Sequence, residues 1–337
     1  MMILYYLYIF IISFFTTFIT TPLVIKLALK INKTGVDIHK PSKPIVPSLG
    51  GIAILIGILS GSLSSIILFH QYYVETLLFL LVVLINGIIG LIDDFKVLKG
   101  IVKMTTTILS TIPLIASSYL FPDKIVLGRP EVPFLGKLRL TLVYWALLPL
   151  IVGGSANAVN MLEVFNGVMP GTCSFIAIAI LLSSIILNKT RSIIFSIIML
   201  GSLLSYYYYN KYPAKVFSGD VGSLSVGGAF GAIAIICRLE IVVMIALIPH
   251  IINAFYVISS VKGFKERRTI RYRPVEVMEN GLIKASKEKD APITLTRIIL
   301  SITGPLEEKY IIKTIFFIEI CTSILAIITA FLIKVKI

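Results

Sequence analysis

The stretch YNKYPAKVFSGDVGSLSVGG, residues 209–228, joins a short basic loop to an apolar, glycine-rich run, and places one carboxylate, Asp220, at the junction. The run after Asp220 is apolar enough to enter a membrane. A carboxylate beside a membrane span is costly unless it is paired or coordinated. The position of Asp220 therefore indicates either a tightly paired residue or a functional site.

The composition of the whole chain agrees with a membrane setting. Of the 337 residues, 57% are hydrophobic and only 14% are charged, and the mean hydropathy is +0.97. This balance is far from that of a soluble globular domain. We therefore predict an all-α integral membrane protein, organised as one polytopic domain over residues 1–337.

Ten apolar runs approach or reach the length of about 17 to 25 residues that a helix needs to cross the hydrocarbon layer. They cover residues 2–24, 50–70, 76–92, 101–121, 140–160, 169–187, 192–209, 222–237, 239–260 and 311–333. The first run lacks a small-residue cleavage site, so we interpret it as a permanent anchor rather than a signal peptide.

Lysine and arginine gather in the loops after the first, third, seventh and ninth runs. Because such residues accumulate in cytoplasmic loops, these loops are predicted to face the cytoplasm and both termini to lie outside, with the cell membrane as the expected location. The net charge of +14 then lies mostly at one membrane face, where it can attract anionic lipids or an anionic substrate. No nucleic-acid motif accompanies this charge, so no nucleic-acid partner is expected.

The remaining segments are short. Proline, glycine and alternating apolar residues in the outer segment 121–140 predict a short hairpin. The cytoplasmic segment 262–292 is too short and too charged to build its own core. The sequence GPLEEKY, residues 304–310, is expected to form a surface turn before the last span. His250 is expected to be a satisfied core histidine.

Three cytoplasmic loops bring polar side chains to one membrane face. LIDDFKVLKGIVK, residues 91–103, contains Asp93, Asp94 and Lys103, and the opening stretch contains Asp220. NAVNMLEVFNG, residues 157–167, contains Asn157, Asn160, Glu163 and Asn166. On a helix, residues 160 and 163 share one face, as do 163 and 166, so this run is expected to present a polar stripe to a common cavity.

Each of these groups also has a purely structural interpretation. Aspartates beside lysines at a helix end are common at solvated interfaces, and asparagines at helix ends are often caps or interhelical hydrogen bonds. Gly219 and Gly222 suit a phosphate or metal site, but glycine suits any tight loop. The convergence of the loops favours a site more strongly than any single member does.

Oxygen ligands without a histidine or cysteine cluster indicate Mg²⁺, with Mn²⁺ as the other candidate. These ions usually share their coordination shell with substrate phosphates. Nearby lysine and arginine would neutralise a diphosphate, and a free aspartate would deprotonate or orient an attacking phosphate oxygen. The set predicts a membrane-embedded phosphotransferase with a lipid nucleophile.

Together, NAVNMLEVFNG, LIDDFKVLKGIVK, YPAKVFSGDVGSL and DIHKPSKPIVPSLGG resemble the polyprenyl-phosphate N-acetylhexosamine-1-phosphate transferases over almost the whole chain. The YPAKVFSGD run and ITGPLEEKY before the last span are most similar to the archaeal and eukaryotic branch, which uses dolichyl phosphate. The peptidoglycan branch normally has DGLDG after NAVN and a histidine-rich final loop. Here the corresponding residues read EVFNG, and the final loop has no histidine.

The resemblance implies a role for each matching residue. Asn160 and Asp220 match magnesium ligands, and Lys103 matches a lysine that contacts the diphosphate. Asp93 and Asp94 match an acidic pair, of which one accepts a proton from the lipid phosphate or positions it. The candidate substrate-binding residues are Phe217, which would stack on uracil, Asn166 and Gly167 in the nucleobase pocket, Asn157 and Glu163 in the polar run, and Arg267, Arg268 and Arg271 in a loop closing over the sugar and phosphates.

The implied activity transfers N-acetylglucosamine-1-phosphate from UDP-N-acetylglucosamine to dolichyl or another polyprenyl phosphate, and a homodimer is left open. Ser48 replaces a glutamate that eukaryotic members carry near the acetamido pocket, so another UDP-N-acetylhexosamine or a UDP-muramyl precursor is an alternative donor. An anion transporter is an alternative of another class. Transporters usually place their binding site near the bilayer midplane, between inverted repeats. Here the few polar residues within spans, such as Asn86 and Glu319, do not occupy corresponding positions of two repeats.

Overall fold

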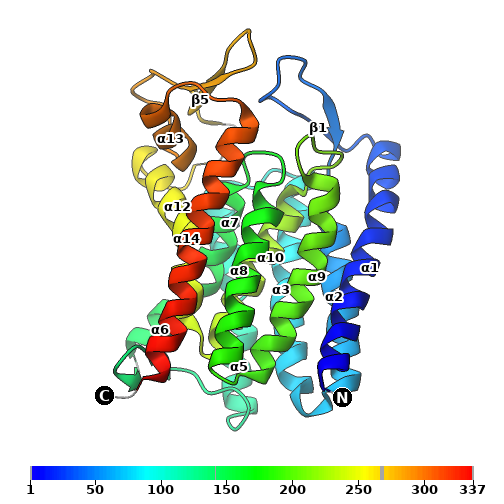
Figure 1. The fold of residues 1–337 in the computed structure, drawn as a ribbon, viewed down its shortest axis with the longest axis vertical. Coiled ribbons are helices and arrows are strands. Elements are labelled where there is room, and N and C mark those ends of the chain that lie inside the picture. The colour runs from blue at the N-terminus through cyan, green and yellow to red at the C-terminus, as the bar shows by residue number, and fades with distance from the viewer. Residues whose placement is uncertain (1, 141, 266–268, 336–337) are drawn as a thin grey trace.

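The computed structural model describes residues 2–140, 142–265 and 269–335. These residues are almost wholly helical, which confirms the predicted fold class, and the long helices run side by side (Figure 1). The helices are α1 (Met2–Lys30), α2 (Gly51–Leu68), α3 (Tyr73–Phe95), α4 (Gly100–Leu109), α5 (Ile112–Leu120), α6 (Leu142–Pro149), α7 (Ser155–Leu162), α8 (Val168–Ile186), α9 (Thr190–Asn210), α10 (Gly219–Cys237), α11 (Glu240–Ala246), α12 (Ile248–Ser260), α13 (Leu295–Thr303) and α14 (Glu308–Lys334).

The chain is an integral membrane protein. In its described part, nine helical segments are long and apolar enough to cross a membrane, and the bent pair α11 and α12 makes a tenth. Their order follows that of the ten predicted runs. α1 begins at the same end of the bundle at which α14 ends, as an even number of crossings requires (Figure 1).

Several spans differ in detail from the predicted runs. α3 continues to Phe95, so Asp93 and Asp94 lie in its last turn rather than beyond it. The fourth span is interrupted between α4 and α5, and the fifth passes through a π-helical turn, Leu150–Gly154. α11 and α12 meet at 69°. Pro249 in the first turn of α12 has no N–H to donate and its ring obstructs a straight continuation.

α10 is the centre of the bundle. Every residue from Val221 to Cys237 is buried, and the helix packs against α2, α3, α7, α9 and α11. Small residues permit this packing, because a Cβ added to Gly51 in α2 would lie only 2.2 Å from the backbone nitrogen of Gly222 in α10. Close backbone approach through small residues is typical of membrane helices. It fixes the start of α10, which carries Asp220.

Three two-stranded hairpins join the helices. The hairpin predicted within residues 121–140 is confirmed, with β3 (Glu131–Val132) antiparallel to β4 (Gly136–Lys137). Two hairpins that the sequence analysis missed lie at the opposite end of the bundle (Figure 1). In one, β1 (Thr34–Val36) pairs with β2 (Ile45–Pro47), and in the other β5 (Val275–Val277) pairs with β6 (Ile283–Ala285).

The segment before α14 is a surface turn, as predicted, with Pro305 and Glu307 exposed, but it is also tied to the bundle. Leu306 exchanges two backbone hydrogen bonds with Ile283 of β6, at 2.8 and 3.0 Å, and the Glu308 side chain is only 5% exposed. Val275 and Ile283 share a small hydrophobic cluster with residues of α7, α13 and α14. Residues 275–285 therefore pack on the bundle instead of forming a core of their own.

His250 is a buried core histidine, as predicted. Its Nε2 lies 3.1 Å from Thr172 Oγ1, and its Nδ1 lies 3.3 Å from Glu319 Oε2. All three side chains are fully buried. The sequence analysis missed the pairing of His250 with Glu319, because the two residues are distant along the chain and meet only where α12 packs on α14.

Replacing Gly51 with alanine is expected to lower the melting temperature of the purified protein in detergent. The added methyl group overlaps the Gly222 backbone, which no rotamer change can relieve, and overpacking typically costs about 1–3 kcal/mol. Gly154→Ala is the control, because no described atom lies within 4 Å of a Cβ there. Equal melting temperatures for the two variants would contradict the close packing of α2 on α10.

Candidate active site

Asp94 joins the end of α3 to the start of α10. Its Oδ1 accepts a hydrogen bond from the backbone N–H of Asp220 at 2.9 Å, and its Oδ2 accepts one from Val221 at 3.0 Å. These N–H groups have no partner within the first turn of a helix, and negative charge is favourable there. Gly219 has a φ of +71°, and a Cβ on it would lie 2.6 Å from Asp94. Both oxygens of Asp94 are thus used in positioning α10.

Lys103 of α4 lies between two other carboxylates. Its Nζ is 2.5 Å from Asp93 Oδ2 and 3.2 Å from Asp220 Oδ2. Asp93 Oδ1 also accepts a hydrogen bond from the backbone N–H of Leu98 at 2.6 Å. The side chain of Asp93 is 3% exposed and that of Asp220 is 28% exposed. Residues predicted from two separate loops therefore meet, with Asp220 as the most accessible member.

Asn160 joins this group from α7, whereas Asn157 does not. The amide nitrogen of Asn160 donates to Asp220 Oδ1 and to Ser223 Oγ, the latter at 2.8 Å. The amide nitrogen of Asn157 instead donates to Thr107 Oγ1 and to the carbonyl oxygen of Gly153, both at 2.7 Å. Asn157 therefore ties α7 to α4, and Asn160 alone of the two contacts an acid of the site.

The prediction that residues 160, 163 and 166 share a helical face is wrong. α7 ends at Leu162, and Gly167 then takes a φ of +77° immediately before α8. This left-handed conformation, which glycine adopts without strain, separates the two helices. Glu163 and Asn166 are consequently placed by the turn between the helices and not by helical periodicity.

Glu163 remains close to Asp220 although it lies outside α7. Burial raises the pKa of the Glu163 carboxyl to about 8; the hydroxyls of Ser218 and Ser223 oppose the rise, and the charges of Asp220 and Asp94 add to it. At neutral pH most Glu163 side chains are therefore protonated. The group adds a proton donor, rather than another negative charge, to this part of the site.

A second polar cluster surrounds Asn166. The Nδ2 of Asn166 donates to Asp37 Oδ2 at 3.0 Å, and its backbone N–H lies 3.4 Å from Glu308 Oε1. Lys40 bridges the two acids, in contact with Asp37 and 3.3 Å from Glu308 Oε2. The sequence analysis missed Asp37, Lys40 and Glu308. For Glu308 the sequence held a signal, because an acidic residue directly before an apolar span requires a partner if its charge is buried. Asp37 and Lys40 lie far from the next span and carried no such signal.

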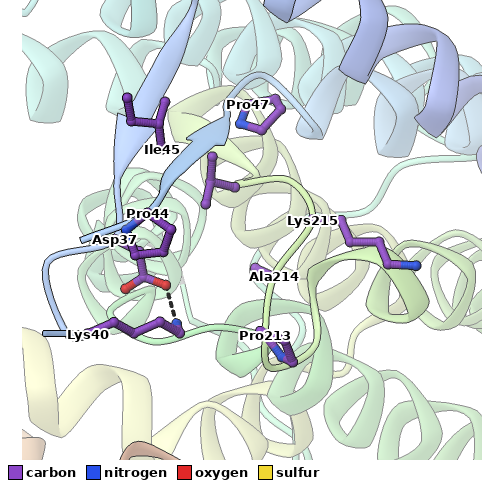
Figure 2. A pocket seen from close by; sticks show the side chains of 9 residues that line it. Asp37, Lys40, Pro44, Ile45, Pro47, Pro213, Ala214 and Lys215 are labelled. Atoms are coloured by element: carbon purple, nitrogen blue, oxygen red, sulfur yellow. Dashed lines mark hydrogen bonds and ion pairs between the residues drawn. The ribbon is translucent and has the colours of Figure 1, made fainter. Parts of the chain in front are cut away.

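A pocket of about 280 Å³ opens beside this cluster. Its walls are Asp37, Lys40, Pro44, Ile45, Val46, Pro47, Pro213, Ala214 and Lys215 (Figure 2). Lys40 extends toward Asp37, whereas Lys215 directs its ammonium group away from them (Figure 2). Hairpin β1–β2 and the loop before α10 thus form opposite sides of the pocket.

Phe217 lies on the loop between this pocket and Asp220. Its backbone N–H donates to the carbonyl oxygen of Pro47 at 2.8 Å. A Cβ added to Gly35 would lie 3.1 Å from the Phe217 ring, so the ring lies directly against β1. The stretch from Phe217 to Asp220 therefore connects an aromatic ring beside hairpin β1–β2 with the carboxylate that contacts Lys103.

The predicted basic loop is only partly placed. Arg267 and Arg268 lie outside the described residues. Arg271 is exposed, and its guanidinium carbon lies 5.2 Å from the centre of the Tyr272 ring. Arg271 forms no ion pair with a described residue.

The donors at Asp220 fit a hard divalent cation that also binds substrate phosphates. Within the described ranges, no group of three or more His, Cys, Asp or Glu side chains is placed to hold a metal by itself. The Asn160 amide nitrogen contacts Asp220 directly. If the planar amide rotates by half a turn, its oxygen takes the position of the nitrogen, and both residues then offer an oxygen atom to a cation. Mg²⁺ is commonly held in this way, by one or two protein groups and phosphate oxygens.

Comparison with known proteins gives consistent matches. Residues 76–238 match the family described as glycosyl transferase family 4. Over 325 residues, 94% of each chain, the protein is 31% identical to a Sulfolobus acidocaldarius protein named "Putative UDP-N-acetylglucosamine--dolichyl-phosphate N-acetylglucosaminephosphotransferase". A Saccharolobus solfataricus protein of the same name is 33% identical over 72% of this chain and 74% of its own. Phospho-N-acetylmuramoyl-pentapeptide-transferase of Halalkalibacterium halodurans is 32% identical over 76% of this chain and 82% of its own.

Asp94→Ala is expected to lower the melting temperature in detergent, because two N–H groups at the start of α10 lose their acceptor. Loss of a helix N-cap typically costs about 0.5–2 kcal/mol. Asp94→Asn keeps one acceptor oxygen and should lie between wild type and Asp94→Ala. The exposed Asp290→Ala is the control for a lost carboxylate. Equal melting temperatures for Asp94→Ala and Asp290→Ala would show that Asp94 does not hold α10.

Glu163→Gln is expected to change how stability depends on pH. The carboxyl has a pKa near 4.5 when unfolded and about 8 when folded, so unfolding releases a proton between these values. The wild-type protein should therefore lose stability relative to Glu163→Gln as the pH rises from 5 to 8, within the interval between those pKa values. Melting temperatures across that interval measure the difference, and parallel curves would contradict the raised pKa.

Proposed function

The chain belongs to glycosyl transferase family 4, and we propose that it transfers N-acetylglucosamine-1-phosphate from UDP-N-acetylglucosamine to dolichyl or another polyprenyl phosphate. The observation that supports this most is the contact of Lys103 with Asp93 and Asp220, beside Asn160, at one end of a membrane bundle. A cationic group among oxygen ligands suits a diphosphate, and a site at the membrane surface is open to a soluble donor and a lipid acceptor.

In the proposed reaction, an oxygen of the lipid phosphate attacks the sugar-linked phosphorus of the donor. A new P–O bond forms to the lipid phosphate, and the bond from that phosphorus to the oxygen bridging the two donor phosphates breaks. The electron pair leaves with UMP. The other product is the lipid diphosphate that carries N-acetylglucosamine, so both phosphorus atoms and the sugar are accounted for.

Asp220 and Asn160 are the residues proposed to hold Mg²⁺, with Mn²⁺ as the other candidate. The bound ion would neutralise charge on the donor diphosphate. Lys103 is proposed to bind a phosphate oxygen through its ammonium group, which Asp93 and Asp220 hold in place. Fixed positive charge aimed at the transferred phosphoryl group is the main source of catalysis in this class of reaction.

Of the acidic pair, we assign Asp93 to the lipid phosphate. Asp94 already accepts two backbone hydrogen bonds at the start of α10 and has a positioning role. Asp93 contacts Lys103 directly, so a phosphate that approaches Lys103 also approaches Asp93. There Asp93 would take up a proton from a monoprotonated lipid phosphate or orient the dianion.

The nucleotide end of the donor is proposed to lie between the two clusters. Phe217 offers a face for the uracil ring, and Asn166 and Gly167 line the base pocket. Glu163 lies at the end of α7, within electrostatic range of Asp220, and a protonated carboxyl there would donate a hydrogen bond to an oxygen of the UDP-sugar. Arg267, Arg268 and Arg271 are proposed to close over the sugar and phosphates, with Asn157 supporting the helix that carries Asn160.

The site is proposed to face the cytoplasm of the cell membrane, because the lysine-rich loops lie on its side of the bundle. A UDP-muramyl donor is the second candidate, since a relative named phospho-N-acetylmuramoyl-pentapeptide-transferase is 32% identical. The higher coverage of the Sulfolobus acidocaldarius relative, at 94% of both chains, favours N-acetylglucosamine and dolichyl phosphate. Membership of an enzyme family disfavours the anion transporter.

Asp220→Ala and Asn160→Ala are expected to reduce transfer to lipid by at least about a hundredfold, the usual effect of losing a group that stabilises transition-state charge. Asn253→Ala is the control, because Asn253 is also a buried amide. It donates to the carbonyl oxygen of Met161, which follows Asn160 in α7. Titration with Mg²⁺ should restore part of the rate of Asn160→Ala but none of Asp220→Ala. Near-normal turnover in either variant at low Mg²⁺ would contradict the metal assignment.

A further inference from the structure

The amide of Asn166 is held in one orientation. Its Nδ2 donates to Asp37 Oδ2 at 3.0 Å, and among the described residues none donates a hydrogen bond to its Oδ1. The side chains of Asn166 and Asp37 are 5% and 4% exposed. The two ends of the amide therefore have different surroundings. The nitrogen end contacts the Asp37 carboxylate, whereas the oxygen end accepts no hydrogen bond from a described residue.

Asp37 can hold only the nitrogen end of that amide. Burial alone would raise the pKa of Asp37, but hydrogen bonds from Lys40 and Asn166 outweigh it, so the pKa lies below its usual value. An ionised carboxylate has no proton to donate and accepts only. If the amide turned over, its oxygen would face the carboxylate and the hydrogen bond would be replaced by a repulsion.

The neighbouring contacts keep Asp37 itself in place. Lys40 contacts Asp37 and Glu308 together, and its Nζ lies 4.8 Å from the centre of the Tyr212 ring. Glu308 accepts from the backbone N–H of Asn166, so it fixes the turn without touching the amide. Asp37 is also a wall of the 280 Å³ pocket, whereas Asn166 lies behind Asp37 and is not itself a wall. The volume of this pocket is sufficient for a pyrimidine ring.

A fixed amide distinguishes uracil from cytosine. With Oδ1 free and the second Nδ2 hydrogen beside it, the amide offers an acceptor and a donor, which match the N3–H and a carbonyl oxygen of uracil. Cytosine has an acceptor at N3 and a donor at N4, and it would need the reverse orientation. An asparagine free to turn over would accept either base.

We propose that Asp37 is a specificity-determining residue, which fixes the Asn166 amide so that the site accepts uridine nucleotides and rejects cytidine nucleotides. This inference rests on the proposed uridine-diphosphate donor and adds the residue that selects its base. Asp37 acts through Asn166 and does not itself need to touch the nucleotide. Lys40 and Glu308 support Asp37 and the turn, but they do not determine the orientation of the amide.

The test is the ratio of dissociation constants for CMP and UMP, measured by titration calorimetry on the full-length protein in detergent with Mg²⁺. Wild type should prefer UMP by at least about tenfold, as expected for a two-point amide contact with a base. Asp37→Asn keeps the shape but allows both orientations, so the ratio should fall to about 1–3. Glu308→Gln is the matched control, because it removes one charge from the same cluster and should keep the wild-type ratio.

The outcomes separate this inference from the proposed function. Binding of neither nucleotide by wild type would overturn both. UMP-selective binding that Asp37→Asn retains would overturn the role of Asp37 alone, as would a Glu308→Gln ratio that falls equally. If Asp37→Asn does not fold, Asp37→Ser replaces it, because a hydroxyl can donate as well as accept and so no longer fixes the Asn166 amide. A CMP-to-UMP ratio near one would then support the proposal, and an unchanged ratio would overturn it.

Discussion

The site depends on one buried ion cluster, in which the ammonium group of Lys103 contacts Asp93 and Asp220. A charge at this depth is tolerated only with its partners, and removing one partner of a buried ion pair typically costs about 3–5 kcal/mol. The ends of α3, α4 and α10 must therefore meet within a few ångströms. Asp94 secures this by bonding the first N–H groups of α10, and the close packing of Gly51 on Gly222 sets the depth of that helix. The cluster is thus supported by backbone contacts that are not themselves part of the proposed chemistry.

The spans and the first cluster could be predicted from sequence because each depends on a local property. An apolar run has to be long enough to cross the membrane. Polar residues at the cytoplasmic ends of several spans then have to lie at the same membrane surface. This reasoning located Asp93, Lys103, Asn160 and Asp220. It could not separate Asp93 from Asp94, because adjacent residues in the last turn of a helix point in different directions, and only the packing of α10 decides which one contacts Lys103.

What the sequence analysis missed depends on contacts between distant segments. The polar stripe expected from Asn160 to Asn166 assumed a continuous helix, but the chain leaves α7 after Leu162 and turns at Gly167. Asp37 and Glu308 lie at opposite ends of the sequence and meet only at the Asn166 turn. His250 and Glu319 also lie on different helices, and they pair only where α12 packs on α14. A buried acid at a helix end signals that a partner exists, but it does not say which one.

In the proposed reaction a phosphosugar, and not the sugar alone, passes to the lipid. The most direct measurement follows UDP-N-acetylglucosamine labelled both in the sugar and in the sugar-linked phosphate, incubated with the purified protein, Mg²⁺ and dolichyl phosphate. We expect both labels to enter the lipid in equal amounts and UMP to be released, with no transfer from UDP-N-acetylgalactosamine or the muramyl-pentapeptide nucleotide. Sugar label in the lipid without phosphate label, together with release of UDP, would contradict it.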